Sequence, residues 1–204
     1  TDSNASKSTK YKNENDHNLQ TILNYKIKYP LKKSGERYNT TLSPIFSARY
    51  SPNKNKNLKD QERIMDYDGI FLLDRLSATE TVEGGQSITF GNEYAIYDKY
   101  NESEIFSLNL ATSLRDQEND KLPVNSTLGQ KMSDIVGEMK LKTNKFIDFN
   151  YNFSVDNNID TLNYHKISSK INVNNFVTTF EFLEENNNLG TDSFVSNETT
   201  YNFN

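Results

Sequence analysis

Strict alternation of polar and apolar residues is the feature that most constrains how this chain can fold. In residues 147–155 every odd position is Ile, Phe, Tyr or Val, and every even position is Asp, Asn or Ser. Successive side chains of a β-strand point to opposite faces, so a strand with this pattern has one apolar face and one polar face. The pattern therefore predicts a β-sheet that is apolar on one side only.

The same period of two recurs along most of the chain, in segments of roughly ten residues. We expect strands at residues 20–29, 41–50, 67–77, 87–97, 106–114, 133–142, 147–155, 160–173, 175–183 and 192–203. A tilted strand of this length is close to what is needed to cross a bilayer. The predicted fold class is all-β, an antiparallel up-and-down meander of about ten strands.

The segments between the predicted strands carry turn and loop residues. Residues 30–37 should form a turn, and residues 51–59 and 116–131 should form polar loops. The adjacent Gly84 and Gly85 permit the positive φ of a tight turn or a bulge. Pro44 lies inside a predicted strand, and because proline has no N–H group we expect an edge, a bulge or weak pairing there.

The polar side of the predicted sheet bears on the choice between a soluble and a membrane architecture. The mean hydropathy is −0.82, yet the chain contains 12 Tyr and 12 Phe residues. A soluble sandwich or a small closed barrel needs a dry apolar core, whereas here one face carries Asp, Asn, Ser, Lys and Glu. A transmembrane barrel with a lipid-facing exterior and a hydrated interior accommodates such a face. We therefore favour a segment of a large transmembrane β-barrel, which by itself would be an open curved sheet.

Two alternatives remain compatible with the same alternation. A soluble carbohydrate-binding β-sandwich module would use the aromatic residues as a sugar platform and would require a dry core. A different outer-membrane barrel, such as a porin or a receptor, would show the same pattern over these strands.

Simple counts argue against several other classes of protein. No window approaches the 18 or so consecutive apolar residues of a membrane-spanning helix. A net charge of −5 argues against a nucleic-acid-binding surface. The chain has no Cys, and its two histidines, His17 and His165, do not form part of a nucleophile-and-base pattern. We therefore expect no enzyme activity, no cofactor and no metal.

The domain organisation follows from where the alternation begins. Residues 1–18 are nearly all polar or charged and should form a disordered lead or an external loop. Residues 19–204 should form a partial outer-membrane β-barrel domain. The chain starts without Met and without an apolar leader region, so we expect it to be a fragment of a longer protein.

The two clearest strands give candidate residues for each face of the wall. On the apolar face the lipid-facing candidates are Phe106, Leu108, Leu110, Ile147, Phe149, Tyr151 and Phe153. On the polar face the lumen-facing candidates are Asn109, Ser113, Asp148, Asn150 and Asn152. Each polar candidate either contacts a saccharide or a lumenal partner, or is simply a hydrated position on a polar wall.

One stretch of the sequence resembles a known family of outer-membrane proteins. Residues 70–91 place Phe71, Asp74, Arg75, Ser77, Glu83, Gly84, Gly85 and Gly91 at the spacing found in the barrel domain of the LPS-assembly protein family LptD, also called OstA. Ala78, Glu80 and Thr81 stand where the family usually has Gly, Asp and Arg. A second match is Ser133, Asp134 and Gly137, which lead into a predicted strand.

The resemblance implies a fold and a task. Members of the family look like very large outer-membrane barrels with a periplasmic domain and an LptE-like plug lipoprotein in the lumen. They receive lipopolysaccharide from a periplasmic Lpt bridge and insert it into the outer leaflet among the outer-membrane lipids. This chain would then be part of the C-terminal barrel domain, located in the cell outer membrane of a Gram-negative bacterium, without the N-terminal domain that meets the bridge.

Overall fold

Ten antiparallel strands form a single sheet in the computed structural model, which describes residues 19–77, 81–143, 146–187 and 190–201. The strands are β1 (Leu23–Lys28), β2 (Leu31–Ser34), β3 (Tyr38–Ser51), β4 (Gly85–Asp98), β5 (Glu104–Arg115), β6 (Ile135–Thr143), β7 (Ile147–Val155), β8 (Leu162–Val173), β9 (Phe176–Asn187) and β10 (Gly190–Tyr201). Their order in the sheet is β1-β3-β4-β5-β6-β7-β8-β9-β10, and β2 also pairs with β3. The predicted all-β meander is confirmed. The polar lead at residues 1–18 lies outside the described residues.

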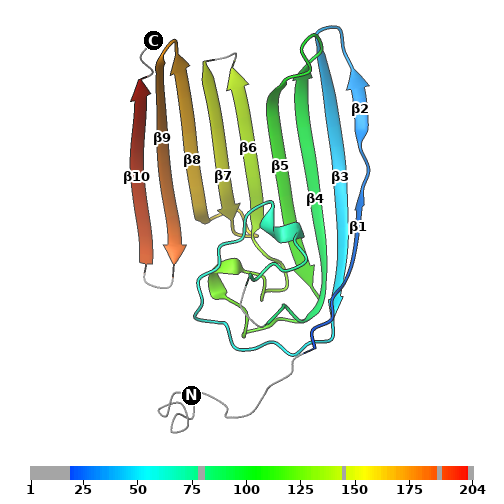
Figure 1. The fold of residues 1–204 in the computed structure, drawn as a ribbon. Coiled ribbons are helices and arrows are strands. Elements are labelled where there is room, and N and C mark those ends of the chain that lie inside the picture. The colour runs from blue at the N-terminus through cyan, green and yellow to red at the C-terminus, as the bar shows by residue number, and fades with distance from the viewer. Residues whose placement is uncertain (1–18, 78–80, 144–145, 188–189, 202–204) are drawn as a thin grey trace.

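The sheet is open, with β1 and β2 along one edge and β10 along the other (Figure 1). Within the described ranges β10 makes no pairing with β1, and no second sheet packs on the first. A two-sheet sandwich is therefore not what this chain forms, whereas a piece of barrel wall is consistent with the arrangement. No helix in the described part of the chain is long and apolar enough to span a membrane.

The first strands correct one prediction and confirm another. Residues 30–37 are not all turn, because Leu31–Ser34 continues the edge strand as β2. Both β1 and β2 pair with β3 in one uninterrupted register, Lys28 opposite Ile45 and Leu31 opposite Leu42. The strand is interrupted at Tyr29 and Pro30, opposite Pro44, although the N–H of Tyr29 donates to the Pro44 carbonyl oxygen at 3.1 Å. Because neither proline can donate a ladder hydrogen bond, the interruption agrees with the weak pairing expected at Pro44.

The predicted strand at residues 67–77 is wrong. This segment contains a short 3-10 helix, η2 (Gly69–Phe71), and belongs to a long connection between β3 and β4 that folds back over the sheet (Figure 1). We call residues 53–77 the strap. A second long connection, residues 116–134 between β5 and β6, contains η3 (Val124–Ser126), and we call it the inner loop. The sheet still has ten strands, as predicted, because β2 was not predicted and the strand predicted in the strap is absent.

The two faces of the sheet differ as the alternation predicts. Direct cross-strand partners share a face. Phe106 pairs with Leu141, Leu141 with Phe149, and Ser169 with Phe180. These pairs trace one mainly apolar surface from β5 to β9. Large side chains on this face are open to the surroundings, including Leu42, Tyr50, Ile88, Phe90, Leu114, Ile147, Ile171 and Phe180. Small polar side chains on the other face are buried, including Ser43, Ser47, Ser51, Ser87, Thr89 and Ser113. A sheet of a soluble protein shows the reverse distribution.

A small apolar core lies on the polar side of the sheet, under the strap and the inner loop. Its buried members are Leu58, Met65, Tyr67, Ile70, Leu76, Ala111, Leu122, Leu128 and Val136. Only Ala111 and Val136 come from the sheet, and the remainder come from the two long connections. The core therefore fastens these connections to β5 and β6 and does not fill a barrel.

Gly137 gives a first prediction, on the apolar face. A Cβ atom at this position would lie 2.3 Å from the ring of Phe153 on the neighbouring strand β7 and 2.9 Å from Leu110 on β5. We expect Gly137→Ala to lower the free energy of unfolding by about 1–3 kcal/mol, because the ring must leave its position. Urea unfolding of the full-length parent protein in lipid vesicles measures this. Phe153→Leu should relieve most of the loss, and an equal loss with and without that second change would contradict the clash.

Candidate functional site

The most highly connected group of charged residues lies between the strap and the polar face of the sheet. Glu83, only 1 % exposed, forms a two-pronged ion pair with Arg75, which is 2 % exposed. Arg75 Nε donates to Glu83 Oε2 at 2.7 Å, and Arg75 Nη2 lies 2.5 Å from Glu83 Oε1. Arg75 also donates to hydroxyl groups on the sheet, at 2.9 Å to Ser113 and 2.9 Å to Ser87.

Two further arginines from the sheet meet the same carboxylate. Arg115, at the end of β5, donates to Glu83 Oε1 and also to the carbonyl oxygens of Gly84 and Leu128, each at 2.9 Å. Arg49, from β3, donates to the backbone oxygens of Glu83 and Leu73. We call Arg49, Arg75, Glu83 and Arg115 the latch.

The latch joins segments that are distant in the sequence. Arg75 lies near the end of the strap and Glu83 lies just before β4. The other two arginines come from β3 and β5. Removing four charged groups from water is costly, and the three guanidinium groups share the single carboxylate of Glu83 and offset the remaining cost with hydrogen bonds to hydroxyl and carbonyl oxygens. Bidentate arginine pairing has a fixed geometry. The arrangement therefore sets where the strap sits on the wall.

The adjacent glycines are needed for the backbone that follows Glu83. Gly85 has φ of +97°, a conformation that side-chain-bearing residues avoid. A Cβ atom at Gly84 would lie 2.0 Å from the carbonyl oxygen of Asn53, the first residue of the strap. The prediction of a tight, glycine-dependent geometry is confirmed at Gly85, and close approach explains Gly84.

The inner loop is fixed to the sheet by a second polar group. Asp134, 4 % exposed, accepts hydrogen bonds from Ser154 Oγ at 2.9 Å and from Asn163 Nδ2 at 2.7 Å, and these partners lie on or beside β7 and β8. Its neighbour Ser133 accepts a hydrogen bond from the backbone N–H of Ser113 at 2.9 Å. The backbone N–H of Asp134 donates to Thr127 Oγ1 within the loop at 2.8 Å.

Asp134 gives a second prediction. Asp134→Ala leaves two donors without their acceptor, and because hydrogen bonds to charged groups contribute about 1.5–3 kcal/mol we expect a loss of about 2 kcal/mol or more in unfolding free energy. Ser154→Ala is the matched control, because it removes one of the two bonds and should cost about 1 kcal/mol. Urea titration of the parent protein in vesicles compares the two, and equal losses would show that Asp134 does not hold the inner loop.

Aromatic side chains of the strap also contact the wall. Phe71 lies over Gly91 of β4, where an added Cβ atom would be 2.5 Å from the ring, so glycine is what allows the ring to approach. Lys26 Nζ of β1 lies 4.5 Å from the centre of the same ring, within the range of a cation–π interaction. Tyr67 packs edge-on against Phe71 at 5.6 Å.

Tyr67 carries the contact further, to an ion pair on the sheet. Its hydroxyl donates to Glu93 Oε1 at 3.1 Å, and Glu93 in turn pairs with Lys28 of β1. Burial raises the pKa of the Tyr67 hydroxyl well above its ordinary value, and the charge of Glu93 and the hydrogen bond to it act in the same direction. The phenol therefore keeps its proton and remains a donor at any physiological pH.

The sequence-predicted face residues are placed on two opposite faces. All seven lipid-facing candidates lie on the apolar face, as the pairing of Leu108 with Met139 and of Met139 with Tyr151 illustrates. The five lumen-facing candidates lie on the polar face. Ser113 is not hydrated there, because the strap covers it and Arg75 binds it.

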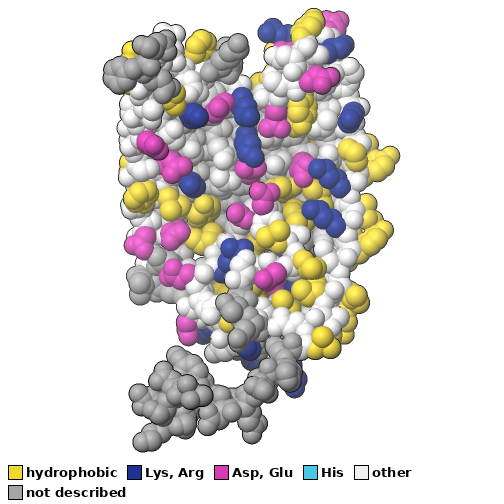
Figure 2. Space-filling view, viewed as in Figure 1, with side chains coloured by type: hydrophobic (Ala, Val, Ile, Leu, Met, Phe, Trp, Pro, Cys, Tyr) yellow, Lys and Arg dark blue, Asp and Glu magenta, His cyan; other side chains and the backbone are white. Residues whose placement is uncertain are grey.

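The strap and the inner loop cover only part of the polar face. Beyond them, over β6 to β9, charged side chains of both signs are spread over the surface (Figure 2). Glu138 pairs with Lys140 at 2.8 Å and Lys166 with Glu181 at 3.6 Å, and the candidates Asp148, Asn150 and Asn152 lie among them. This part of the face carries charges of both signs.

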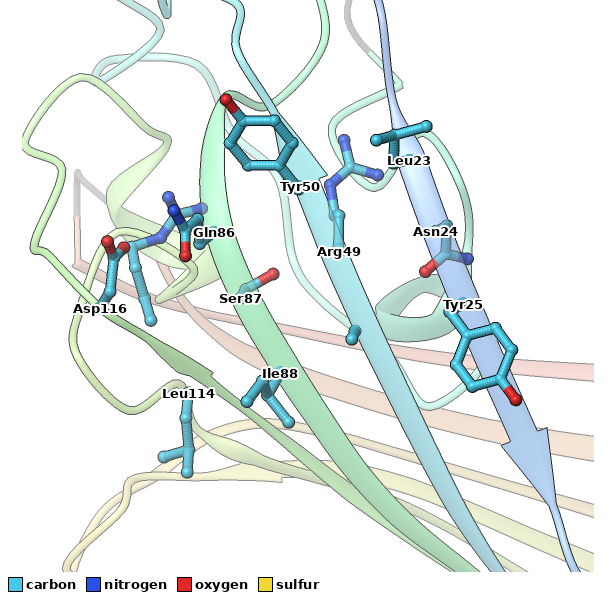
Figure 3. Close-up of a pocket in the computed structure, with 12 residues that line it drawn as sticks. Leu23, Asn24, Tyr25, Arg49, Tyr50, Gln86, Ser87, Ile88, Leu114 and Asp116 are labelled. Atoms are coloured by element: carbon cyan, nitrogen blue, oxygen red, sulfur yellow. The ribbon is translucent and has the colours of Figure 1, made fainter.

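A groove of about 640 Å³ lies at the strap end of β1, β3, β4 and β5 (Figure 3). Its apolar lining comes from Leu23, Tyr25, Tyr50, Ile88 and Leu114. These residues belong to the apolar face, and the groove has no nucleophile with a base beside it. Within the described ranges, no three His, Asp or Glu side chains gather as a metal site would require. The apolar lining of the groove suits contact with apolar molecules.

Sequence reasoning singled out two members of the latch, Arg75 and Glu83, but did not predict their contact. Arg75, Glu83, Gly84 and Gly85 stood out as family-motif residues, as did Phe71 and Gly91, and the structure brings each of these sets into contact. Asp74 accepts a hydrogen bond from the backbone N–H of Ser77, which has φ of 51°. This pair shapes the turn at the end of the strap. Arg49 and Arg115 were missed, because each looks like an ordinary polar residue of an alternating strand.

A one-layer antiparallel sheet with one apolar face and one polar face under folded-in loops is consistent with a fragment of a β-barrel. The family profile named LPS transport system D, LptD, matches residues 1–202. The chain therefore belongs to the LptD family, a family of lipopolysaccharide transport and assembly at the outer membrane of Gram-negative bacteria. No curated protein sequence matches it.

Proposed function

We propose that this chain forms part of the wall of an outer-membrane barrel that inserts lipopolysaccharide into the outer leaflet. In this role the apolar face borders lipid and the polar face lines a hydrated lumen. The observation that carries the proposal is the inverted distribution of side chains, with Leu42, Phe90 and Phe180 open on one face and Ser47, Thr89 and Ser113 buried on the other. Lipopolysaccharide as the cargo is inferred from membership of the LptD family.

In this role the segment acts through the shape and the polarity of its surface. The hydrated wall from Glu138 to Glu181 offers hydroxyl, amide and charged groups to the saccharide part of the lipid, and no bond needs to be made or broken. Other partners come with the family role: an LptE-like plug lipoprotein facing the polar side, outer-membrane lipids on the apolar side, and the periplasmic Lpt bridge through a domain outside this chain.

The connections suggest which end of the wall faces outward. The strap, the inner loop and the β7–β8 turn lie at one end of the strands, and the short β4–β5 and β8–β9 turns lie at the other (Figure 1). Outer-membrane barrels have short periplasmic turns and longer extracellular loops. We therefore place the strap at the extracellular end of the lumen.

The experiment uses single Cys substitutions at each position of β7 (Ile147–Val155), in the full-length parent protein in outer membranes. Each variant is labelled with a lipid-soluble and with a water-soluble thiol reagent, and the absence of Cys from this chain keeps its background low. Positions 147, 149, 151 and 153 should take the lipid-soluble reagent, and 148, 150 and 152 the aqueous one. Shielding of the odd positions from both reagents would mean a dry core and would exclude the barrel wall.

A further inference from the structure

A small pocket lies where the strap, the inner loop and the sheet meet. Its volume is about 230 Å³. Ile64 of the strap and Val124 of the inner loop form part of the lining, and Ser154 of β7 and Tyr164 of β8 belong to the sheet. Pockets that hold drug-sized ligands measure roughly 300–1,000 Å³. The space is therefore suited to a ligand of about one ring.

The lining of this pocket combines polar groups with apolar patches. In the described part of the chain every lining side chain is uncharged, and most end in an amide or a hydroxyl group, as Gln130 and Thr127 do. A sugar hydroxyl both donates and accepts hydrogen bonds, and amide and hydroxyl side chains can do the same. The C–H groups of a sugar ring match Ile64, Val124 and the ring of Tyr164, which has an apolar body and a polar tip. The chemistry of the lining is therefore that of a sugar site.

Several polar groups of the lining have no partner. Within the described residues the Tyr164 hydroxyl and the Gln130 amide make no hydrogen bond, and the Nδ2 atom of Asn125 is buried without one. Buried polar groups are nearly always paired with protein, water or ligand. A turn of the Asn125 side chain toward an occupant would pair its amide. Unpaired groups around one space therefore point to a ligand in that space.

The inner loop holds the pocket in a strained but fixed shape. Thr127 has φ of 53°, which a β-branched residue rarely adopts. Strain of this kind persists where the surroundings impose it, and it is common at ligand-binding sites. Here the backbone N–H of Asp134 donates to Thr127 Oγ1 at 2.8 Å, and Asp134 in turn accepts hydrogen bonds from Ser154 and Asn163 of the lining. The binding groups are therefore already in place before a ligand arrives, which lowers the cost of binding.

The charges beside the pocket are negative. Asp134 is bound to two lining residues, and Glu185 of β9 is the cross-strand partner of Tyr164. The charge of Asp66, from the strap, also acts on the Tyr164 hydroxyl. Among the described residues no Lys or Arg lines the pocket. A phosphate group would therefore meet carboxylates without the cations that normally bind it.

We propose that this pocket binds a single neutral sugar ring at the strap end of the wall. The inference rests on the proposed function, because it adds one defined binding site to a polar face that borders a lumen. The ligand class is an uncharged pyranose, and a phosphorylated sugar is excluded by the neighbouring carboxylates.

Saturation-transfer NMR tests the ligand class, on the full-length parent protein in phosphatidylcholine nanodiscs, which contain no sugar. The probes are methyl α-glucoside, methyl α-galactoside and the 6-phosphates of glucose and galactose. We expect at least one neutral glycoside to bind, and the matching phosphate to bind about tenfold more weakly or not at all, because like charges repel. Absence of binding by both neutral glycosides would overturn the proposal, and so would equal binding of the phosphate.

Two substitutions test the location of the site. Tyr164→Phe and Gln130→Ala remove polar groups that have no partner in the described residues, so folding should be unaffected. Each should raise the dissociation constant about two- to tenfold, the effect of losing one neutral hydrogen bond. Tyr151→Phe makes the same chemical change on the apolar face and should leave binding unaltered.

The outcomes separate this inference from the proposed function. Unchanged binding in the double variant Tyr164→Phe with Gln130→Ala would place the sugar elsewhere and would overturn the proposal. Aqueous labelling of positions 148, 150 and 152 reports the wall independently. That labelling without sugar binding would reject the pocket and leave the barrel wall in place.

Discussion

The Glu83→Ala variant of the full-length parent protein should accumulate far less folded barrel than any other single substitution considered for this chain. The change leaves Arg49, Arg75 and Arg115 buried around a missing carboxylate. Removing one partner of a buried ion pair costs about 3–5 kcal/mol, which is a large part of the stability of most domains. The folded fraction is measured by gel electrophoresis, as the fraction of protein whose mobility changes when the sample is heated. Urea unfolding in vesicles then measures the stability of the protein that does fold.

Two comparisons make that result specific to the latch. Glu181→Ala removes a carboxylate from the same face, but its pair with Lys166 is partly exposed and should contribute only about 1 kcal/mol or less. The double change Glu83→Leu with Arg75→Met removes both members of the central pair and should recover part of the loss, because apolar residues can replace a buried ion pair. A double variant as defective as Glu83→Ala would contradict this account.

Arginine substitutions on neighbouring residues of β7 should have sharply different costs. Phe149 lies on the apolar face and Asn150 on the polar face of the same strand. If the apolar face borders lipid, Phe149→Arg should lower the unfolding free energy by about 2–4 kcal/mol, the cost of an arginine near the bilayer midplane. Asn150→Arg should cost less than about 0.5 kcal/mol, because the Oδ1 atom of Asn150 makes no hydrogen bond within the described residues that would be lost and a longer arginine side chain can extend from the polar face among its charged neighbours.

The difference between these two variants is the measured quantity, from urea titrations of each in the same vesicles. Both substitutions add one positive charge to adjacent positions of one strand, so their effects on net charge cancel. Equal costs would mean that the two faces see the same environment, and the membrane assignment of the apolar face would then be untenable.

Local alternation predicts the sheet well, because each face meets a uniform environment. The strand at Ile147–Val155 is observed with the predicted bounds, since its alternation is strict and polar turns flank it. β9 extends to Asn187, beyond the predicted end at 183, because its acidic residues can still pair with β10. β2 was missed because Lys32 and Lys33 give it no apolar face, and it forms as a continuation of β1 along β3.

The strap shows where apolar content misleads. The apolar residues of 67–77 favour a strand, but Tyr67 and Ile70 are three positions apart, which does not fit a period of two, and both pack into the small core under the strap. Period alone does not tell whether an apolar residue meets lipid or another part of the chain. The latch was also beyond local reasoning, because Arg49 and Arg115 lie 34 and 32 positions from Glu83.

The make-up of the latch has a consequence for the order in which the chain assembles. Arg75 and Glu83 precede β4 in the sequence, yet they are fully matched only when Ser113 and Arg115 at the far end of β5 have arrived. Hairpins between successive strands close short loops and form early, whereas contacts between distant positions wait for them. The strap is therefore the last part of this region to settle, and a closed latch reports that β3, β4 and β5 are already in register.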